Sequence, residues 1–304
     1  MGGCGSSSSG EQGARTQGYT VTDARGKTLS FTEKPQRIIS LYVFADEVLL
    51  DLVEHRRIAG LDKWVHDPGL SLGYAEAKDV TTIVEQNIEG IIAVKPDLVL
   101  MPDTAKEDFV ASLEEVGQRV FVYKLAARAD EIPGMITTLG QAVGEPERAA
   151  QMNRTLAKRL AAVRKKVDKL PAEARERALL LLRFGAIGGK GCIFNDTMTL
   201  AGVIDCYNEV RAVDQTLPGM SRILSKEEAV KANPDIIILG SWSQGGAYAN
   251  SDQQLAELYN DPAYAEVEAI KNKRVIVIPQ SYVNCLSQHI ATGVERLYEA
   301  VYEK

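Results

Sequence analysis

The chain has 304 residues, of which 45% are hydrophobic and 25% charged, and its mean hydropathy is -0.13. This length and composition are typical of a globular protein of two lobes, each able to bury a core without disulfides. The formal net charge of -6 argues against a nucleic-acid partner, because a phosphate-binding face needs clustered Lys and Arg. No stretch reaches the roughly 18 apolar residues that a membrane-spanning helix requires.

Residues 1–18 read MGGCGSSSSGEQGARTQG, a Gly- and Ser-rich run that is too polar to order and predicts a flexible tether. Cys4 has two interpretations: an incidental thiol, or the lipid-bearing cysteine of a bacterial lipoprotein signal. We favour the second, which predicts an exported protein that is lipid-anchored to the membrane (or periplasmic) and does not span it. Because no charged or apolar signal segment precedes Cys4, we expect this start to be truncated or wrongly assigned.

Residues 19–143 predict an N-terminal α/β lobe. It begins with a hairpin that turns at 25–27, after which strands and helices alternate. The expected strands lie at 37–42, 57–62, 97–101 and 119–124. Runs that are apolar on both faces are typical of parallel strands covered by helices on each side.

Residues 144–171 break this rhythm and predict one long connecting helix. Its apolar positions step by threes and fours, while its other face is rich in Arg and Lys. That basic face is either an ordinary solvated surface, which we favour, or a surface for a partner.

Residues 172–304 restart the alternation and predict a C-terminal α/β lobe. The fold expected is therefore two Rossmann-like lobes with parallel sheets, joined by one long helix.

One phrase occurs in both halves. Residues 87–103 read NIEGIIAVKPDLVLMPD and residues 225–241 read SKEEAVKANPDIIILGS. In each copy a glutamate, Glu89 or Glu227, precedes a Pro-Asp pair by seven and eight positions, and an apolar run follows. The proline ends a helix, and the apolar run is a core strand. A carboxylate at a helix start is favoured by the helix dipole, so capping alone accounts for both glutamates without any function.

The order of three stretches resembles the substrate-binding lipoproteins of ABC importers for iron–siderophores, haem and cobalamin. These stretches are RIISLYVFADEVLLDLVEHRRIAGLDKW, NIEGIIAVKPDLVLM and ILSKEEAVKANPDIIIL, and the likeness covers about residues 19 to 304. In that family a glutamate on each lobe docks onto arginines of the membrane permease. The resemblance implies this role for Glu89 and Glu227, in a monomeric receptor that carries no cofactor and passes a small-molecule metal chelate to a permease.

Ligands of open parallel sheets bind beyond the carboxyl ends of the strands. The aromatic, histidine and arginine residues predicted at or near those ends are Tyr42, Trp64, His66, Tyr74, Arg183, Phe184, Trp242 and Tyr282. Aromatic walls bury flat or greasy ligands, and a guanidinium can bind an anionic group in bidentate fashion. The alternative for each ring is that it only closes the end of the core.

A site for a bare metal ion is not expected, because the chain has only three histidines. His55 is predicted at a helix end on the surface, and His289 is predicted to pack or cap in the last helix. His66 alone falls at a predicted ligand position, where contact with a bound metal or haem iron stays open. A chelated ligand is therefore favoured over a naked cation, with ferric siderophore first and haem or corrinoid next.

Two alternatives remain. One is an enzyme, a chelatase or similar cofactor-handling enzyme, and the other is a molybdate-type oxyanion receptor that binds its ligand through Arg183. The Gly-rich FGAIGGKGCIF is not a P-loop, because its spacing to Lys190 fails and Gly191 stands where Ser or Thr is needed. Its glycines fit either a tight turn or an approach of backbone amides to the ligand. A disulfide between Cys192 and Cys206 and two buried thiols are both open.

Overall fold

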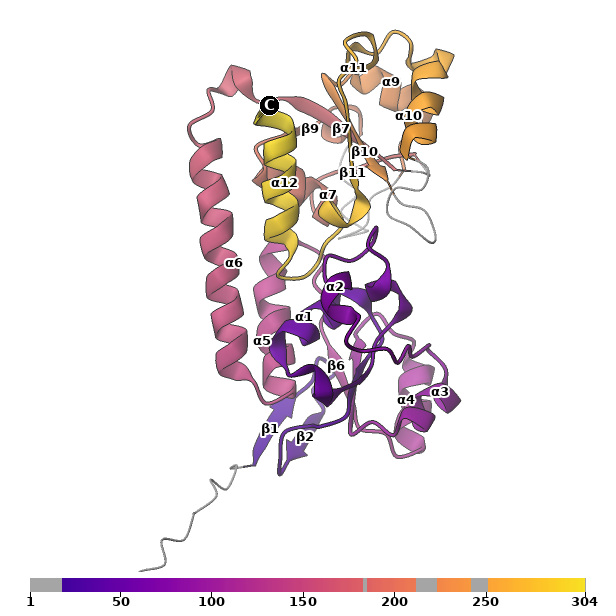
Figure 1. Cartoon of the computed structure of the whole chain (residues 1–304), viewed down its shortest axis with the longest axis vertical. Helices are drawn as coiled ribbons and strands as arrows, with labels where there is room; N and C mark the ends of the chain where they lie inside the picture. Colours follow the sequence, from indigo (N-terminus) through magenta and orange to yellow (C-terminus); the bar gives the residue numbers. More distant parts are fainter. Residues whose placement is uncertain (1–17, 183–184, 212–222, 242–250, 304) are drawn as a thin grey trace, which may run out of the picture.

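The computed structural model describes residues 18–182, 185–211, 223–241 and 251–303. Two α/β lobes stand one above the other, and a long helix runs along one side of both (Figure 1). This arrangement confirms the predicted fold class. The boundaries expected for the tether, the lobes and the connector stay predictions.

The N-terminal lobe starts with the predicted hairpin. Strands β1 (Tyr19–Thr22) and β2 (Thr28–Phe31) pair antiparallel, with Tyr19 opposite Phe31. Asp23 is buried at the turn, where its carboxylate accepts hydrogen bonds from the backbone N–H groups of Arg25 and Lys27, both at 2.9 Å. The turn is thus held by one side chain.

A four-stranded parallel sheet forms the centre of this lobe. Its spatial order is β4 (Ile58–Gly60), β3 (Ile38–Ser40), β5 (Leu98–Pro102) and β6 (Val120–Tyr123). Side chains alternate between the two faces, so Ile38 and Leu100 belong to one apolar cluster and Ile39 and Val99 to another. The covering helices are α1 (Val43–Leu52), α2 (Tyr74–Ala77), α3 (Ile88–Val94), α4 (Glu107–Glu115) and α5 (Ile132–Ala142). Burial on both faces explains the continuous apolar runs.

The C-terminal lobe has a five-stranded sheet that is not wholly parallel. The main order is β11 (Val275–Pro279), β10 (Ile236–Ser241), β7 (Arg177–Leu182) and β8 (Gly185–Ile187), and β9 (Ile204–Asp205) also pairs with β7. Strand β8 runs antiparallel to β7, a reversal that the apolar pattern does not signal. The helices are α7 (Ile193–Leu200), α8 (Tyr207–Val210), α9 (Lys226–Ala232), α10 (Ser251–Asn260), α11 (Glu268–Lys271) and α12 (Ile290–Tyr302).

Helix α6 (Pro146–Val167) is the predicted long helix and is 22 residues long. It packs against α5 of the first lobe and α12 of the second. Its inward stripe includes the buried Met152, Leu156 and Val163. In the part of the chain that the structure describes, no helix has both the length and the apolar character to cross a bilayer.

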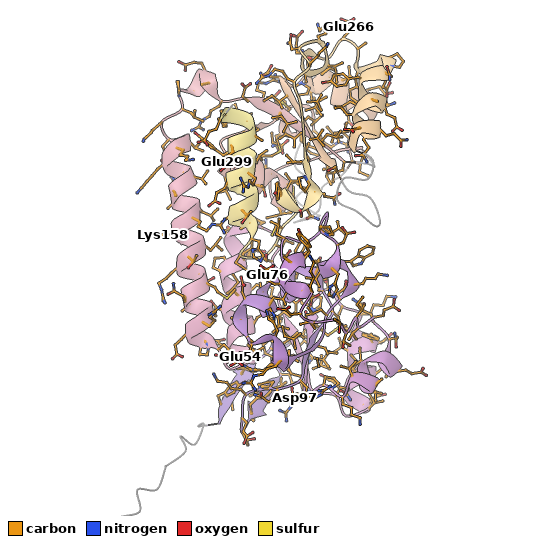
Figure 2. All side chains as sticks on the ribbon, viewed as in Figure 1. Glu54, Glu76, Asp97, Lys158, Glu266 and Glu299 are labelled. Atoms are coloured by element: carbon orange, nitrogen blue, oxygen red, sulfur yellow. The ribbon has the colours of Figure 1, made fainter. Side chains whose placement is uncertain are left out.

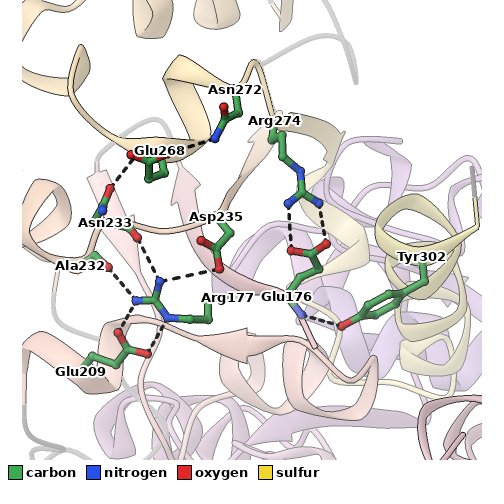
Figure 3. A network of polar contacts seen from close by, with 10 residues as sticks. All are labelled: Glu176, Arg177, Glu209, Ala232, Asn233, Asp235, Glu268, Asn272, Arg274 and Tyr302. Carbon is green, nitrogen blue, oxygen red and sulfur yellow. Dashed lines mark hydrogen bonds and ion pairs between the residues drawn. The ribbon is translucent and has the colours of Figure 1, made fainter. Parts of the chain in front are cut away.

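The repeated phrase folds the same way in both lobes. Helices α3 and α9 each end at a left-handed residue, Lys95 (φ 51°) and Asn233 (φ 39°), directly before the Pro-Asp pair. The guanidinium of Arg37, beside β3, donates to the carbonyls of Val94 and Lys95. Arg177, at the start of β7, donates in the same way to Ala232 and Asn233 (Figure 3).

The aspartate of each phrase completes this junction. The Asp97 carboxylate accepts from the backbone N–H groups of Gln36 and Arg37. Asp235 lies 3.8 Å from Arg177 Nη1, and its own backbone N–H donates to the Arg177 carbonyl (Figure 3). Each lobe therefore joins a helix end, a strand start and a neighbouring strand through one arginine and one aspartate.

A buried carboxylate on α1 connects the two lobes. Glu47 is 1% exposed and accepts hydrogen bonds from Ser71 Oγ at 2.6 Å and from the Leu72 backbone N–H at 2.8 Å. From the other lobe, the Ser287 hydroxyl donates to the second carboxylate oxygen. Gln288 Nε2 donates to the Glu47 carbonyl at 2.8 Å. Four donors from two chain segments, one in each lobe, thus converge on one residue.

Its neighbour Asp46 is also buried but is poorly satisfied. Asp46 Oδ2 accepts from the Asp62 backbone N–H at 2.9 Å, while Oδ1 has no hydrogen-bond partner among the described residues. Ser40 Oγ and Tyr123 OH, at the ends of β3 and β6, are likewise buried without a partner there. Burial raises the pKa of Asp46 well above its ordinary value, and the negative charge of the nearby Asp62 adds to the increase.

Replacing Glu47 by Ala should lower the free energy of unfolding by about 3 kcal/mol, because the buried Ser71 and Ser287 hydroxyls lose their acceptor. Chemical denaturation of the purified protein measures this. Glu54→Ala is the control, since Glu54 is an exposed residue paired with Arg56 on the surface and should leave the midpoint unchanged. Equal midpoints for the two variants would contradict the bridging role of Glu47.

The Asp46→Asn variant should be more stable than the parent at neutral pH, by on the order of 1–3 kcal/mol. The folded state of the parent holds the Asp46 proton above pH 3.8, whereas the unfolded chain releases it, so the stability of the parent falls as pH rises from about 4. The difference in melting temperature between variant and parent should therefore widen with pH and then level off. A constant difference between pH 4 and pH 8 would refute the assignment.

Candidate functional site

The carboxyl ends of strands from the two sheets meet where the lobes join (Figure 1). After β11, the backbone N–H of Ser281 donates to the carbonyl of Gly69, which follows β4. After β6, the backbone N–H of Ala129 donates to Asp196 Oδ2 on α7, at 2.9 Å. Both contacts cross between the lobes, so this junction is the place where the strand-end rule puts a ligand.

Tyr42 and Trp64 lie at the N-terminal side of this junction. Tyr42 follows β3 as the N-cap of α1, is half-buried, and meets the Phe44 ring edge-on at 5.6 Å between centroids. Burial raises the pKa of Tyr42, so its phenol stays protonated at neutral pH and can donate a hydrogen bond. The backbone N–H of Trp64 is held by Asp62 Oδ1 at 2.8 Å, and Lys63 Nζ lies 5.0 Å from the Trp64 ring centroid.

His66 ends the same short 3₁₀ helix, Lys63–His66. Burial lowers its pKa, which the nearby Asp62 carboxylate partly opposes, so the imidazole is neutral at pH 7. Its Nε2 atom is buried and has no hydrogen-bond partner in the described ranges. A neutral ring with an unoccupied nitrogen is chemically able to bind a metal, but the buried position requires the side chain to rotate first.

Tyr74 and Tyr282 approach the junction from opposite lobes. Tyr74 begins α2 and is 37% exposed, with Lys78 Nζ 5.2 Å from its ring centroid. Tyr282 ends the 3₁₀ helix Gln280–Tyr282 and packs on the core. A Cβ at Gly293 of α12 would lie 2.0 Å from the Tyr282 carbonyl oxygen, so a glycine is required there to hold Tyr282 close to α12.

Four other predicted site residues, Arg183, Phe184, Trp242 and Cys4, lie outside the described residues. The aromatic and cationic contribution of the second lobe therefore stays a prediction, apart from the position of Tyr282. Among the residues that are described, no group of three or more His, Cys, Asp or Glu side chains could hold a metal ion.

The Gly-rich segment is organised by Asp205, which the sequence reasoning missed. The Asp205 carboxylate is buried and accepts from the Gly189 N–H at 2.9 Å, from the Tyr207 N–H at 3.0 Å and from Asn195 Nδ2 at 3.0 Å. Gly189 has φ +100°. This segment is thus a tight turn whose Gly189 amide is already occupied. The signal in the sequence that could have indicated this role is an acidic residue, Asp205, at the end of the short strand that follows the Gly-rich segment.

The cysteines beside this turn form no disulfide. Cys192 and Cys206 are buried free thiols, as is Cys285 in the segment before α12. The open choice between a disulfide and free thiols is thereby decided in favour of thiols. The other two histidines have positions of a structural kind: His55 Nδ1 is 3.0 Å from Asp79 Oδ2, and His289 is the N-cap residue of α12.

Glu89 and Glu227 occupy matching positions, each exposed in the first turn of its helix. The capping roles belong to other residues: Asn87 accepts from the Gly90 N–H in α3, and Ser225 with Glu228 forms a capping box in α9. Hydrogen bonds from its own backbone and from Ser225 lower the pKa of Glu227. Helices α3 and α9 lie on the side of the molecule opposite α6 (Figure 1).

Comparisons with known proteins agree with this architecture. The family model described as "Periplasmic binding protein" matches residues 38–282. A cobalamin-binding protein from Halobacterium salinarum is 25% identical over 226 residues, which cover 73% of this chain and 58% of that protein. The uncharacterized ABC transporter substrate-binding lipoprotein YvrC from Bacillus subtilis is 24% identical over 291 residues, covering 93% of this chain and 85% of that protein.

A solved structure shows the same fold. The periplasmic heme-binding protein RhuT from Roseiflexus sp. RS-1 superposes with a TM-score of 0.71 and 19% sequence identity, covering 88% of this chain and 98% of that one. This chain spans 58% of the length of the Halobacterium relative. The match to the family model nevertheless covers well over half of the present chain. The chain therefore belongs to the periplasmic binding protein family, a family of binding proteins and not of enzymes, as the sequence predicts.

Proposed function

We propose that this protein is the extracytoplasmic substrate-binding component of an ABC importer. It binds a chelated metal between its lobes and delivers it to a membrane permease. The observation that carries the proposal is the junction itself, where Tyr42, Trp64 and Tyr282 lie beyond strand ends of two facing sheets. The names of relatives, which include a cobalamin-binding protein and a substrate-binding lipoprotein, support the same class.

Of the ligand classes considered, we rank a ferric siderophore first, and haem and a corrinoid next. Half-buried aromatic rings offer flat apolar contact at low entropic cost, which suits all three. Acceptors on the first lobe, Asp62 and the exposed Asp103, suit ligands with amide or hydroxyl donors. Arg183, Phe184 and Trp242 would complete the site from the second lobe, with Arg183 binding an anionic group.

Membrane attachment and docking are further parts of the proposal. A lipid on Cys4 would anchor the chain, and the name of the Bacillus relative supports this. Glu89 and Glu227 would meet basic residues of the permease. Both are exposed at the surface and neither is the N-cap residue of its helix. Exposed ion pairs add little affinity but set orientation and encounter rate, which is what a delivering receptor needs.

Protein purified from its native host should carry a chromophore with a ferric charge-transfer band. A Soret band or a corrinoid spectrum would instead identify the second or third ligand class. Titration of the apo protein should then show that Trp64→Ala weakens binding at least about tenfold, since a buried aromatic anchor is lost. Val116→Ala, which removes an exposed side chain at the end of α4 in the same lobe, is the control. Failure of all three ligand classes to bind saturably would refute the proposed ligand.

Replacing Glu89 and Glu227 together by Ala should reduce transport by about tenfold or more, while the ligand dissociation constant stays within about twofold. The double variant Glu115→Ala/Glu266→Ala removes one exposed glutamate from each lobe outside α3 and α9 and should transport normally (Figure 2 labels Glu266). Uptake of labelled ligand by cells measures the first effect, and titration measures the second. A large loss of ligand affinity in the first variant would show that these glutamates belong to the ligand site.

A further inference from the structure

Helix α6 carries a row of basic side chains on its outer face. The row consists of Arg154, Lys158, Lys165 and Lys169, the last just beyond the helix end, and all four are exposed. The buried residues Met152, Leu156, Val163 and Val167 have the same spacing, shifted by two positions. A shift of two residues is about 200° around a helix, so the row points directly away from the core. Figure 2 shows Lys158 at the outer edge of the molecule.

The basic residues of α6 that face α12 form salt bridges in the described part of the chain, unlike those of the outer row. Arg159 Nη2 lies 2.6 Å from Glu295 Oε2, and Lys166 Nζ lies 2.9 Å from Glu303 Oε1. Within the described ranges, none of the four residues of the outer row forms a salt bridge, and the Arg154 guanidinium bonds only the neutral Gln151. The fold therefore neutralises the basic residues beside α12 and leaves the outer row unneutralised.

This row is a local feature and not a reflection of overall charge. Residues 146–169 contain eight Arg and Lys residues and two acidic residues, in a chain whose formal net charge is -6. The helix is 22 residues long, about 33 Å, and forms one edge of the molecule (Figure 1). The four cations therefore form an extended, nearly straight line along an accessible edge.

We propose that this outer row rests on the surface of an anionic phospholipid bilayer. A line of cations fits a flat, diffuse negative surface. The neighbouring exposed side chains, Ala157, Ala161 and Ala162, are too small to provide the large anchors typical of protein interfaces. Basic residues near such a surface bind its headgroups cumulatively. Repulsion from the acidic remainder of the molecule is screened beyond about 10 Å at ordinary ionic strength.

The inference goes beyond the proposed function and does not depend on it. It assigns the molecule a resting orientation, with α6 against the bilayer. Helices α3 and α9, which carry Glu89 and Glu227, lie on the opposite side (Figure 1). In this orientation the two helices that carry these glutamates lie on the side away from the membrane, so release of the α6 row has to precede any docking through them.

The test is vesicle co-sedimentation of the full chain produced without a lipid. The parent should bind vesicles of phosphatidylcholine and phosphatidylglycerol at low salt, should not bind phosphatidylcholine alone, and should dissociate at high salt. The row variant, Arg154→Gln/Lys158→Gln/Lys165→Gln/Lys169→Gln, should lower the partition coefficient at least about tenfold. Circular dichroism checks that the variant is folded.

The matched control is Lys106→Gln/Lys124→Gln/Lys190→Gln/Lys231→Gln, which removes four exposed lysines away from α6. Both variants make the net charge more negative by four, so net charge alone would affect them equally. The control should stay within about twofold of the parent. Equal losses in both variants, retained binding by the row variant, or no preference for anionic vesicles would overturn the proposal. Binding of the row to polyglutamate but not to vesicles would likewise overturn it and assign the row to an acidic protein.

Discussion

In each lobe the guanidinium of an arginine beside the first sheet strand closes the carboxyl end of a helix that lies far away in sequence. Arg37 does this for α3 and Arg177 for α9. The helix positions its exposed glutamate, and the strand positions the residues at the lobe junction. The arginine therefore ties the outer surface of the lobe to its sheet, because a helix end without hydrogen-bond donors would leave carbonyls unsatisfied. The same solution in both lobes is the physical meaning of the repeated phrase.

The two lobes are coupled by buried polar contacts as well as by α6. Glu47 joins α1 to the segment that precedes α12, with donors such as Ser71 and Ser287 on both sides. A buried carboxylate requires all of its donors, so sliding or twisting of one lobe against the other is costly. Together with the packing of α6 on α5 and α12, this favours a stiff frame in which the junction changes little in shape.

The local features of the fold were predictable from the sequence. Proline ends α3 and α9, continuous apolar runs place the strands, and the stepped apolar pattern places α6, because each signal depends on neighbours within a few residues. Partners distant in sequence were not predictable. The bond between Ser287 and Glu47 spans 240 positions, and Asp205 organises a glycine turn 16 residues away. The antiparallel β8 was missed because its residues, Gly185–Ile187, belong to the Gly-rich segment that the sequence assigns to a turn or a ligand-binding loop.

For the candidate site too, the local positions of residues were predictable and their distant contacts were not. Tyr42, Trp64 and His66 do follow the ends of β3 and β4, because strand ends can be read from apolar runs, while their role in binding a ligand stays a prediction. The burial of the His66 Nε2 atom could not be foreseen, since it depends on packing from other segments. Likewise, only the structure separates Glu89 and Glu227 from the residues that cap their helices, because either kind of residue is favoured in a first turn.

The burial of the cysteines in the described part of the chain bears on their reaction with oxidants. Burial raises the pKa of Cys206 to about 12 and raises that of Cys285 well above its ordinary value, while Cys192 is buried beside the glycine turn. Thiolates are the reactive species in oxidation and disulfide exchange, and these two groups hold almost none at neutral pH. Cys206 and Cys285 are thus slow to react with oxidants in the folded protein.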